Sequence, residues 1–559
     1  VQVALAEWPP PNRLPLDTLT HAERGWGAAQ LWYPGHSMIR ARTATLSPLG
    51  ARLTMGSSPD GRSVTLGEAA EVAWPKGAVA DADTTLDSAR VDIAIDAAAG
   101  QTYTVTEIVS IVPSYDDRSS LAAAVRDAAS ARRAGVDALA ARNAEAWRQR
   151  WETDIEIQGD TALQRVVRSM LFYLLCSADS GTALAIPPMG LSTAGYYGHV
   201  FWDSDTWMFP ALVLTHPDVA RSLVDFRSRA LGAAQDRARS YGFRGAMYPW
   251  ESDELGRETT PHFAAQNAHS EIHVTGDVAV AQWQYYLATG DSAWLVRRGF
   301  PVIRETANFW VSRATYDSTR DRYDIKDVVS VAEGLVGVTD DAYTNAVARR
   351  NLDIATIASR RLGLRADPQW AAVAAKLHMP MDSVTQSYRT YEGAPDSTLG
   401  VITPLLSYPL GVPMSDRVKR THLEQAMRRI EDEAAGAMMG VTLLSVDAAE
   451  LGLRALVDSL LPYSYQPHVH GPFLMLSETP GNKAFDFLTG AGGFLQQVIF
   501  GYTGLRLESA GLVPAFPPVL PSRVTRLVLR NIQVRGKHYD ITVDASGRRM
   551  EPHRAAPPQ

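Results

Sequence analysis

At 559 residues the chain is longer than one hydrophobic core usually supports, so two or three domains are expected, at least one of them large. Hydrophobic residues make up 46% and charged residues 21%, which excludes a mainly disordered or fibrous chain. A net charge of −7 without a local basic patch argues against a nucleic-acid partner.

The sequence contains no stretch near the roughly 18 consecutive apolar residues of a membrane span. It begins with Val1 rather than methionine, as an exported protein without its signal peptide would, although a cloning boundary looks the same. A periplasmic or secreted location is therefore favoured over a cytoplasmic one. The one cysteine, Cys176, follows an apolar run, which predicts a buried, inert thiol and excludes an intrachain disulfide.

Residues 1–118 are predicted to form a small N-terminal β domain. Strand-like patterns run from residue 31 to residue 113, including period-two alternation at 91–95. An alanine- and arginine-rich stretch follows, with strong helix propensity and one weak point at Gly135. We interpret residues 119–158 as a helical linker packed by Trp147 and Trp151.

Helical patterns separated by turn signals recur over residues 159–503. Gly290 is placed to end one helix and Asp291 to cap the next. Further helices are expected at 342–362, 415–433 and 446–461. So many helical pairs indicate an open solenoid or a closed α/α toroid, and the lack of a fixed repeat favours the toroid.

Strand patterns return near the C-terminus, at 524–529, 532–534 and 539–543. Residues 504–546 are therefore predicted to form a small C-terminal β domain, and residues 547–559 a disordered tail. The predicted fold class is mainly α, with a β domain at each end.

The 13 Trp and 20 Tyr residues suit either a protein core or a sugar-binding cleft, because a pyranose ring stacks on an aromatic plane. In residues 198–207 aromatic side chains alternate with carboxylates. Trp202 and Asp203 there would stack on a sugar and bind two of its hydroxyls. The alternative role for Asp203 or Asp205 is a helix N-cap.

Two further segments carry candidate carboxylates. A proline-fixed turn presents Trp250 and Glu251 side by side, either as a sugar-binding wall or as a packed indole beside a solvated carboxylate. Glu333 lies in an almost uncharged segment, where its protonated form is favoured, as a general acid requires. The alternative for Glu333 is an exposed loop residue.

Glu478 stands among polar residues just ahead of a glycine-rich run at 487–496. Polar neighbours favour a carboxylate that stays ionised and activates water. The glycines would allow close backbone approach, or they serve tight helix packing. Paired with Glu333, Glu478 would complete the acid and base that hydrolyse a glycosidic bond with inversion.

In this order, the segments resemble glycoside hydrolase family 65 over residues 147–543. The matching pieces are 198–203, 248–252 with 256–258, 342–345, 407–410, and 477–478 ahead of 487–496. The resemblance implies an (α/α)6 barrel between a small β-sandwich-like domain and a small C-terminal β domain. It also implies an inverting α-glucosidase that releases a terminal α-linked glucose or similar sugar, with an α-1,2 linkage as the first expectation.

The resemblance assigns a role to each candidate residue. Glu333 matches the general acid and Glu478 the general base, while Trp202, Asp203, Trp250 and Glu251 match the wall that holds the terminal sugar. No metal or organic cofactor is implied. The expected partner is a small oligosaccharide or glycoconjugate, and a homodimer is left open.

Three departures keep two alternatives open, a phosphorylase and a sugar-binding protein without activity. The family usually has Asp-Glu-Tyr-His around the acid, where this chain has Ala332-Glu333-Gly334-Leu335, and a Lys-Gln pair where it has Leu399-Gly400. The N-terminal β domain is also shorter than the family's β-sandwich. The phosphorylase branch holds phosphate with a His-x-Ser-Ser loop, whereas residues 441–445 contain no histidine.

Overall fold

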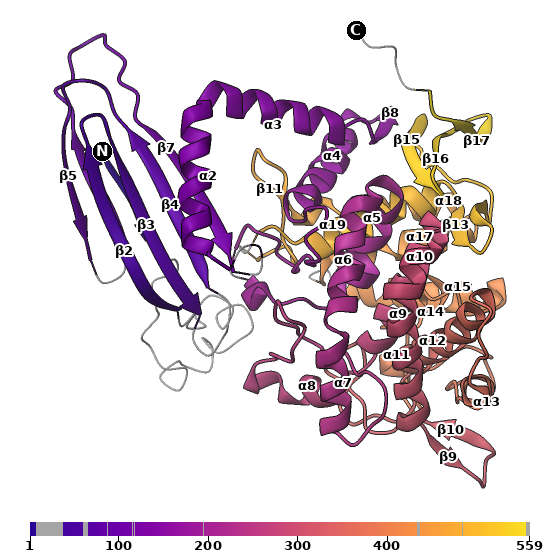
Figure 1. The fold of residues 1–559 in the computed structure, drawn as a ribbon. Coiled ribbons are helices and arrows are strands. Elements are labelled where there is room, and N and C mark those ends of the chain that lie inside the picture. Colours follow the sequence, from indigo (N-terminus) through magenta and orange to yellow (C-terminus); the bar gives the residue numbers. More distant parts are fainter. Residues whose placement is uncertain are drawn as a thin grey trace. The chain divides into compact units, whose positions relative to one another are not determined.

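The computed structural model describes residues 1–6, 37–59, 65–85, 88–114, 116, 118–193, 195–432, 436–482 and 485–554. They form two compact units, Val1–Trp151 and Glu152–Gln559 (Figure 1). Parts of three predictions lie outside the described residues: the strand patterns at 31–36, the end of a helix at Glu433, and the tail at 555–559.

The first unit contains two antiparallel sheets. One has the order β2-β3-β4-β7, with β2 at Ser37–Ser47, β3 at Gly50–Pro59, β4 at Leu66–Ala73 and β7 at Thr106–Pro113. The other has the order β1-β6-β5, with β1 at Gln2–Ala6, β6 at Ser88–Ala94 and β5 at Val79–Thr84.

The two sheets share one hydrophobic core. Leu53 and Val72 from the four-stranded sheet belong to the same buried cluster as Val91 and Ile93 of β6. The strand predicted at 91–95 is thus confirmed, one residue shorter at its C-terminal end. Because both sheets bury their alternate residues in this cluster, the unit is a sandwich.

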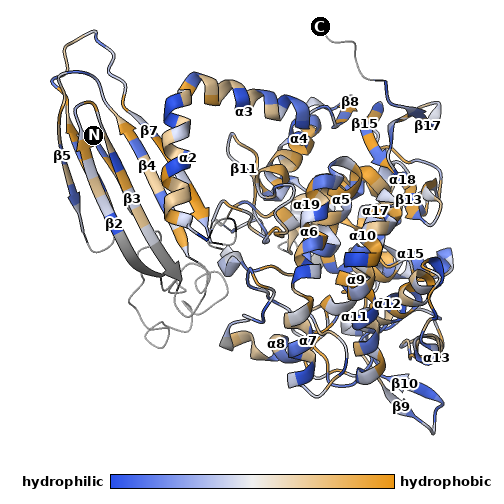
Figure 2. Ribbon diagram, in the orientation of Figure 1, coloured by the Kyte–Doolittle hydropathy of each residue, from blue (hydrophilic) through white to orange (hydrophobic). Residues whose placement is uncertain are grey.

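A helix, α2 (Ser120–Ala134), covers the other face of the four-stranded sheet. Its small residues Ala123 and Ala124 pack on Ala69, and a Cβ at Gly67 of β4 would lie 2.2 Å from the helix backbone. Figure 2 shows β7, beneath the helix, mainly in the hydrophobic colour.

Gly135, with φ 84°, separates α2 from α3 (Val136–Arg150). No side chain of α3 is buried, and the half-buried Trp147 and Trp151 stack on each other with ring centroids 6.2 Å apart. The predicted helical stretch is therefore two helices.

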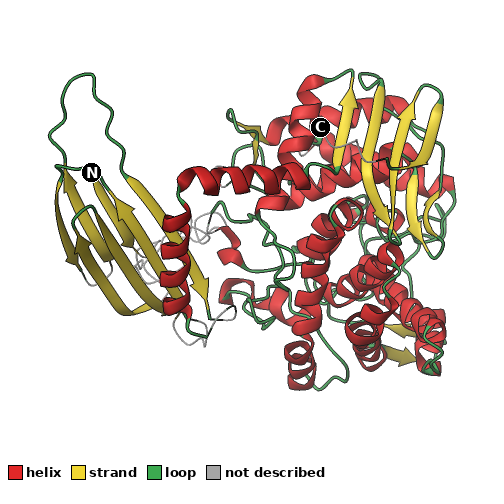
Figure 3. Cartoon of the chain, turned by 45° about the horizontal axis from the view of Figure 1, so that its top comes forward, coloured by secondary structure: helices red, strands yellow, loops and turns green. Residues whose placement is uncertain are grey.

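The second unit is mainly helical, as predicted (Figure 3). Its longer helices are α4 (Thr161–Cys176), α6 (Pro217–Arg229), α7 (Leu231–Ser240), α9 (Val274–Thr289), α11 (Phe300–Arg313), α12 (Ala342–Arg361), α13 (Pro368–Lys376), α15 (Asp416–Asp432), α18 (Arg454–Tyr463) and α19 (Leu488–Gln496). Shorter helices are α5 (Phe209–Thr215), α8 (Ala265–Ser270), α10 (Ser292–Trp294), α14 (Pro404–Ser407), α16 (Met438–Thr442) and α17 (Leu444–Glu450). Three segments have π-helical hydrogen bonding: η3 (Asp203–Met208), η5 (Leu295–Gly299) and η8 (Gln497–Tyr502).

Helix boundaries follow the capping residues of the sequence. Gly290 ends α9 in the left-handed conformation, with φ 69°, and the Asp291 side chain accepts a hydrogen bond from Trp294 N at the start of α10. Both predictions are confirmed. The single helix predicted at 446–461 is instead the pair α17 and α18, because Gly452 lies between them with φ 69°.

The last sheet has the order β17-β16-β15-β8 and lies on one side of the helical unit (Figure 3). Its strands are β8 (Asp154–Gln158), β15 (Arg526–Val534), β16 (Lys537–Asp544) and β17 (Gly547–Pro552). Short antiparallel hairpins complete the unit: β9 (Thr315–Asp317) with β10 (Arg322–Asp324), β11 (Val469–His470) with β12 (Met475–Leu476), and β13 (Leu505–Glu508) with β14 (Gly511–Pro514).

Two predicted boundaries are wrong at this sheet. Residues 154–158, assigned to the helical linker, form β8, which buries Ile155 and Ile157 and pairs with β15. Residues 547–552, assigned to a disordered tail, form β17, which pairs with β16.

The buried thiol predicted at Cys176 is also wrong. Cys176 is exposed at the C-terminal end of α4. The buried face of α4 runs through Val167, Leu171, Leu174 and Leu175. Successive residues of a helix are rotated by about 100°, so the residue after Leu175 leaves that face.

Candidate active site

A cavity of about 420 Å³ in the helical unit is lined by Glu333, Glu478 and Trp202. These residues come from three segments far apart in the chain. The structure thus brings both predicted catalytic carboxyl groups to one space.

Glu333 lies at the tip of a tight loop. Its backbone is in the left-handed region, with φ 55°, and its N–H donates to Ser330 O at 2.7 Å. Glu333 is an exposed residue, as the alternative of a loop glutamate predicted, and it also lines the cavity. Partial desolvation of its carboxyl group, together with the carboxylates of Glu271, Asp203 and Glu478, raises the pKa of Glu333 to about 8. The carboxyl group is therefore mainly protonated at neutral pH.

Glu478 follows β12 and is half-buried. Its Oε2 accepts a hydrogen bond from the Tyr196 hydroxyl at 2.6 Å. Burial raises the pKa of Glu478 above its ordinary value, and the bond from Tyr196 opposes the rise because it favours the ionised form.

The two aspartates of segment 198–207, Asp203 and Asp205, have different surroundings. Asp205 pairs with the fully buried Arg227 at 2.6 Å, and Arg227 also donates to Phe201 O and to Ser252 Oγ. Asp203 instead accepts from Thr489 Oγ1 at 2.5 Å, and burial raises its pKa to about 6. Since the residue before η3 is Trp202, neither aspartate is its N-cap.

Trp202 is held by a buried charged network. Its ring packs edge-on against His273, with centroids 4.8 Å apart, and against Tyr343, 5.7 Å apart. Burial disfavours the imidazolium of His273, but hydrogen bonds with Asp277 at 2.7 Å and Glu271 at 3.2 Å outweigh it and raise the pKa to about 10. A fixed positive charge therefore lies behind the indole.

Trp250 and Glu251 are both buried, which excludes the alternative of a solvated Glu251. Trp250 packs edge-on against Phe201, with centroids 5.3 Å apart. Glu251 Oε2 lies 2.7 Å from His199 Nδ1, while Oε1 has no hydrogen-bond partner. Burial and neighbouring carboxylates, including that of Glu333, raise the pKa of Glu251 to about 9.

The sequence reasoning missed the residues that hold these groups. The contacts described above come from Tyr196, His199, His273 and Thr489. The polar residues next to Glu478 in the sequence are Ser477, Thr479 and Asn482. The Ser477 hydroxyl bonds His470 Nε2 and Thr479 O. His199 lies within the segment 198–207, and Tyr196 precedes that segment by two residues, so a slightly longer segment would have included both.

The glycine run after Glu478 serves tight helix packing. A Cβ at Gly492 would lie 2.5 Å from Trp207 O, and one at Gly493 would lie 2.3 Å from Thr442 Oγ1. The run lets α19 pack directly on η3, which carries Asp203, and on α16.

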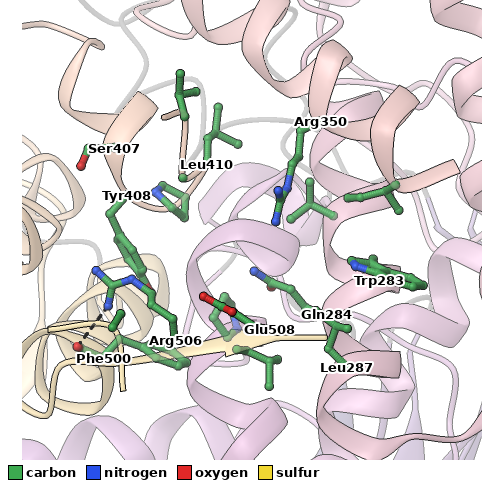
Figure 4. A pocket seen from close by; sticks show the side chains of 18 of the residues that line it. Trp283, Gln284, Leu287, Arg350, Ser407, Tyr408, Leu410, Phe500, Arg506 and Glu508 are labelled. Carbon is green, nitrogen blue, oxygen red and sulfur yellow. Dashed lines mark hydrogen bonds between the residues drawn. The ribbon is translucent and has the colours of Figure 1, made fainter. Parts of the chain in front are cut away.

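A larger cavity, of about 540 Å³, lies elsewhere in the helical unit between α9, α12, the segment 407–414 and β13. Figure 4 shows Gln284, Arg350 and Glu508 within it, and Arg506 beside Tyr408. None of the predicted site residues lines this cavity.

Two features are absent from the described residues. These residues contain no helix long and apolar enough to cross a membrane. They also contain no group of three or more His, Cys, Asp or Glu residues placed to hold a metal ion.

Comparisons with known proteins identify the family. Residues 168–397 match the "Glycosyl hydrolase family 65 central catalytic domain", and residues 38–150 match the "Glycosyl hydrolase family 65, N-terminal domain". The chain belongs to glycoside hydrolase family 65. The family match includes Trp202, Asp203, Trp250, Glu251 and Glu333.

Several similar curated proteins are hydrolases or glucosidases by name, and one is a kojibiose phosphorylase of Halothermothrix orenii, 39% identical over 37% of this chain. A kojibiose hydrolase of Mucilaginibacter mallensis is 37% identical over 79% of this chain and 65% of its own length. A protein-glucosylgalactosylhydroxylysine glucosidase of Dictyostelium discoideum is 34% identical over 73% of this chain and 57% of its own length. The chain thus spans less than two thirds of these relatives.

One solved structure shares the fold at low identity. It is described as a proposed kojibiose phosphorylase from the human microbiome and has a TM-score of 0.73 and 15% identity, covering 91% of this chain and 71% of its own. At that identity the likeness concerns the fold alone.

Proposed function

We propose that the chain is an inverting glycoside hydrolase that releases a terminal α-linked glucose, or a similar sugar, from a small α-glucoside. Glu333 is the general acid and Glu478 the general base. The observation that carries this proposal is that both carboxyl groups line one cavity, with a protonated Glu333 and a Glu478 that is hydrogen-bonded by Tyr196.

The proposed reaction is a single displacement. Glu333 donates its proton to the glycosidic oxygen while Glu478 takes a proton from a water molecule, whose oxygen bonds to the anomeric carbon from the opposite face. The C1–O bond to the leaving group breaks, and an α-glucoside yields β-glucose. Inversion requires about 6.5–9.5 Å between the two carboxyl groups, which leaves room for the water.

The sugar wall is proposed to consist of Trp202, Asp203, Trp250 and Glu251. Glu478 contributes to the raised pKa of Asp203, and Glu333 to that of Glu251, whereas Asp203, Trp250 and Glu251 are not among the described residues that line the cavity. Glu251 Oε1 is buried without a partner and suits a sugar hydroxyl. The helices that carry this wall are proposed to form an (α/α)6 barrel, in line with the fold likeness to the family member.

Water is favoured over phosphate as the nucleophile. Residues 441–444 contribute only Val441, Leu443 and Leu444 to the cavity, and Arg429 is the only Lys or Arg among its described lining residues. Arg429 already donates to Ser397 O. The α-1,2-linked kojibiose is the first substrate to test because the similar proteins include kojibiose hydrolases. A periplasmic or secreted location and a homodimer belong to the same proposal.

The test is glucose release from kojibiose, nigerose, maltose, isomaltose and trehalose, with and without phosphate. Proton NMR should detect β-glucose as the first anomer, and Glu333→Gln and Glu478→Gln should each lower kcat at least about 100-fold, the lower end of what general acid–base catalysis contributes. Retention of configuration, or a sugar 1-phosphate formed only with phosphate, would contradict the proposal. Binding without turnover in the parent would favour an inactive sugar-binding protein.

A further inference from the structure

Much of the described cavity wall beyond Glu333 and Glu478 is aliphatic, and the remainder includes Trp202, Trp207, Tyr408, Arg429 and Asp447. The aliphatic part is formed by four stretches of chain, which contribute Val331, Ala332, Val401, Ile402, Leu405, Ile430, Val441, Leu443 and Leu444. A sugar ring needs a hydrogen-bonding partner for most of its hydroxyls, whereas an alkyl chain needs none.

Gly400 explains why this wall is apolar. A Cβ at Gly400 would lie 2.5 Å from Ala426 N, so α15 packs directly on the Gly400 backbone. This packing places Ala426 and Ile430 of α15 in the cavity wall. A long polar side chain at Gly400 would require α15 to move.

The described residues of the same wall include few polar side chains, and two of these already donate hydrogen bonds to other parts of the protein. The Tyr408 hydroxyl donates to Gln496 Oε1 at 2.7 Å, and Arg429 donates to Ser397 O at 2.8 Å. Asp447 is buried, and that burial raises its pKa to about 8, so it is mainly uncharged at neutral pH. Among the described residues, Arg429 is therefore the main charged group on this side of the cavity, in contrast to the side with Glu333 and Glu478.

The larger cavity of the same unit is lined differently. Gln284, Arg350 and Glu508 project into it, beside Trp283 (Figure 4). The aliphatic wall is thus a property of the carboxylate-bearing cavity and not of every cavity in this unit.

We propose that the aliphatic wall binds an aliphatic leaving group, so that the preferred substrates are α-glucosides with an alkyl aglycone rather than disaccharides. The inference rests on the proposed hydrolysis. Glu333 would protonate the oxygen of the leaving group, and its neighbours Val331 and Ala332 line the same cavity. Water and the glucoside give β-glucose and the free alcohol, and the alkyl chain stays in the aliphatic part of the cavity until release.

The first experiment measures kcat/KM for methyl, butyl and hexyl α-D-glucopyranoside and for kojibiose. Each buried methylene contributes about 0.8 kcal/mol, which is about fourfold, so the hexyl compound should exceed the methyl compound at least about tenfold. The kcat/KM of the hexyl compound should also exceed that of kojibiose. Equal values along the series, or a preference for kojibiose, overturn the inference while leaving the hydrolase proposal intact.

Substitutions in the aliphatic wall test whether the alkyl chain binds there. Val401→Thr and Ile430→Gln change half-buried wall residues and should lower the hexyl-to-methyl ratio about fourfold each, with little change for the methyl compound. The matched control Ile357→Gln, at a 46% exposed residue of the larger cavity, should leave the ratio unchanged. An unchanged ratio in both wall variants contradicts the inference.

A binding measurement separates the inference from catalysis. Isothermal titration of the Glu333→Gln variant with the same three glucosides should give affinities that rise with chain length, even if the parent enzyme turns over none of them. Absence of turnover with chain-length-dependent binding overturns only the hydrolase proposal. Affinities independent of chain length overturn the inference.

Discussion

The surroundings of Glu333 and Glu478 determine the pKa values of their carboxyl groups. These values set the pH range in which the proposed acid is protonated while the proposed base is ionised. The pKa of Glu333 is raised to about 8, and burial also raises the pKa of Glu478, a rise that the hydrogen bond from Tyr196 opposes. We expect kcat/KM to fall above about pH 8, as Glu333 loses its proton, and to fall at acid pH, as Glu478 gains one. A pH profile of glucose release measures both limbs, and an alkaline limb near pH 5 would contradict the assignment of Glu333.

Tyr196 is the residue whose removal should change the acid limb alone. A hydrogen bond to a charged group is worth about 1.5–3 kcal/mol, so Tyr196→Phe should move that limb up by about one to two pH units. The neighbouring Tyr197→Phe serves as the control, because the ring of Tyr197 packs on His199, with centroids 5.3 Å apart. Equal acid limbs in both variants would show that Tyr196 does not tune the base.

The contacts of single residues were the least predictable part of the site. Tyr196 is 282 residues from Glu478, and Asp203 is 286 residues from Thr489. The local sequence identifies a candidate carboxylate. It does not identify a hydrogen-bond donor that lies nearly 300 residues away in the chain. The charge of His273 likewise depends on Glu271 and Asp277 facing the ring from both sides, which follows from the turn before α9.

At the scale of elements, the packing of α19 on η3 holds the Asp203 segment in place. A Cβ at Gly492 would lie 2.5 Å from Trp207 O, so Gly492→Ala should lower the free energy of unfolding by about 1–3 kcal/mol and reduce kcat/KM. Gly232→Ala is the control, since Gly232 lies in α7 with open space at its Cβ. It should raise stability by about 0.5–1 kcal/mol. Urea unfolding measures both, and equal effects would contradict the packing argument.

Helices with strong capping signals were predicted well, whereas two short strands, β8 and β17, were not. Gly290 and Asp291 mark their boundary in the sequence itself. Residues 154–158 alternate only over five positions and follow a strongly helical stretch, so their strand depends on β15, nearly 370 residues later. Residues 547–552 are hydrophilic and become a strand only because β16 offers a paired edge.

At the scale of the whole molecule, the helical unit is closed by a sheet that joins its first and last segments. Ile155 of β8 is fully buried opposite Leu529 of β15, so Ile155→Ala should cost about 2–5 kcal/mol of unfolding free energy in urea. Ile357→Ala, at a 46% exposed position, should cost far less. A loss of equal size in the two variants would mean that β8 contributes little to the unit.

The division into units was only partly visible in the sequence. The change from strand to helix patterns places the boundary near the alanine-rich stretch, but the two compact units divide after Trp151 rather than at 118 or 158. Composition changes along the chain where secondary structure changes, while a unit boundary depends on which segments share a core.

The exposed position of Cys176 has a practical consequence for solution work. Because the chain has one cysteine, oxidation cannot join two parts of the same molecule, but an exposed thiol can form a disulfide with that of a second molecule. Such a covalent pair would have the mass of a dimer without any interface of its own. Oligomeric state is therefore best measured with reductant present, or with Cys176→Ser.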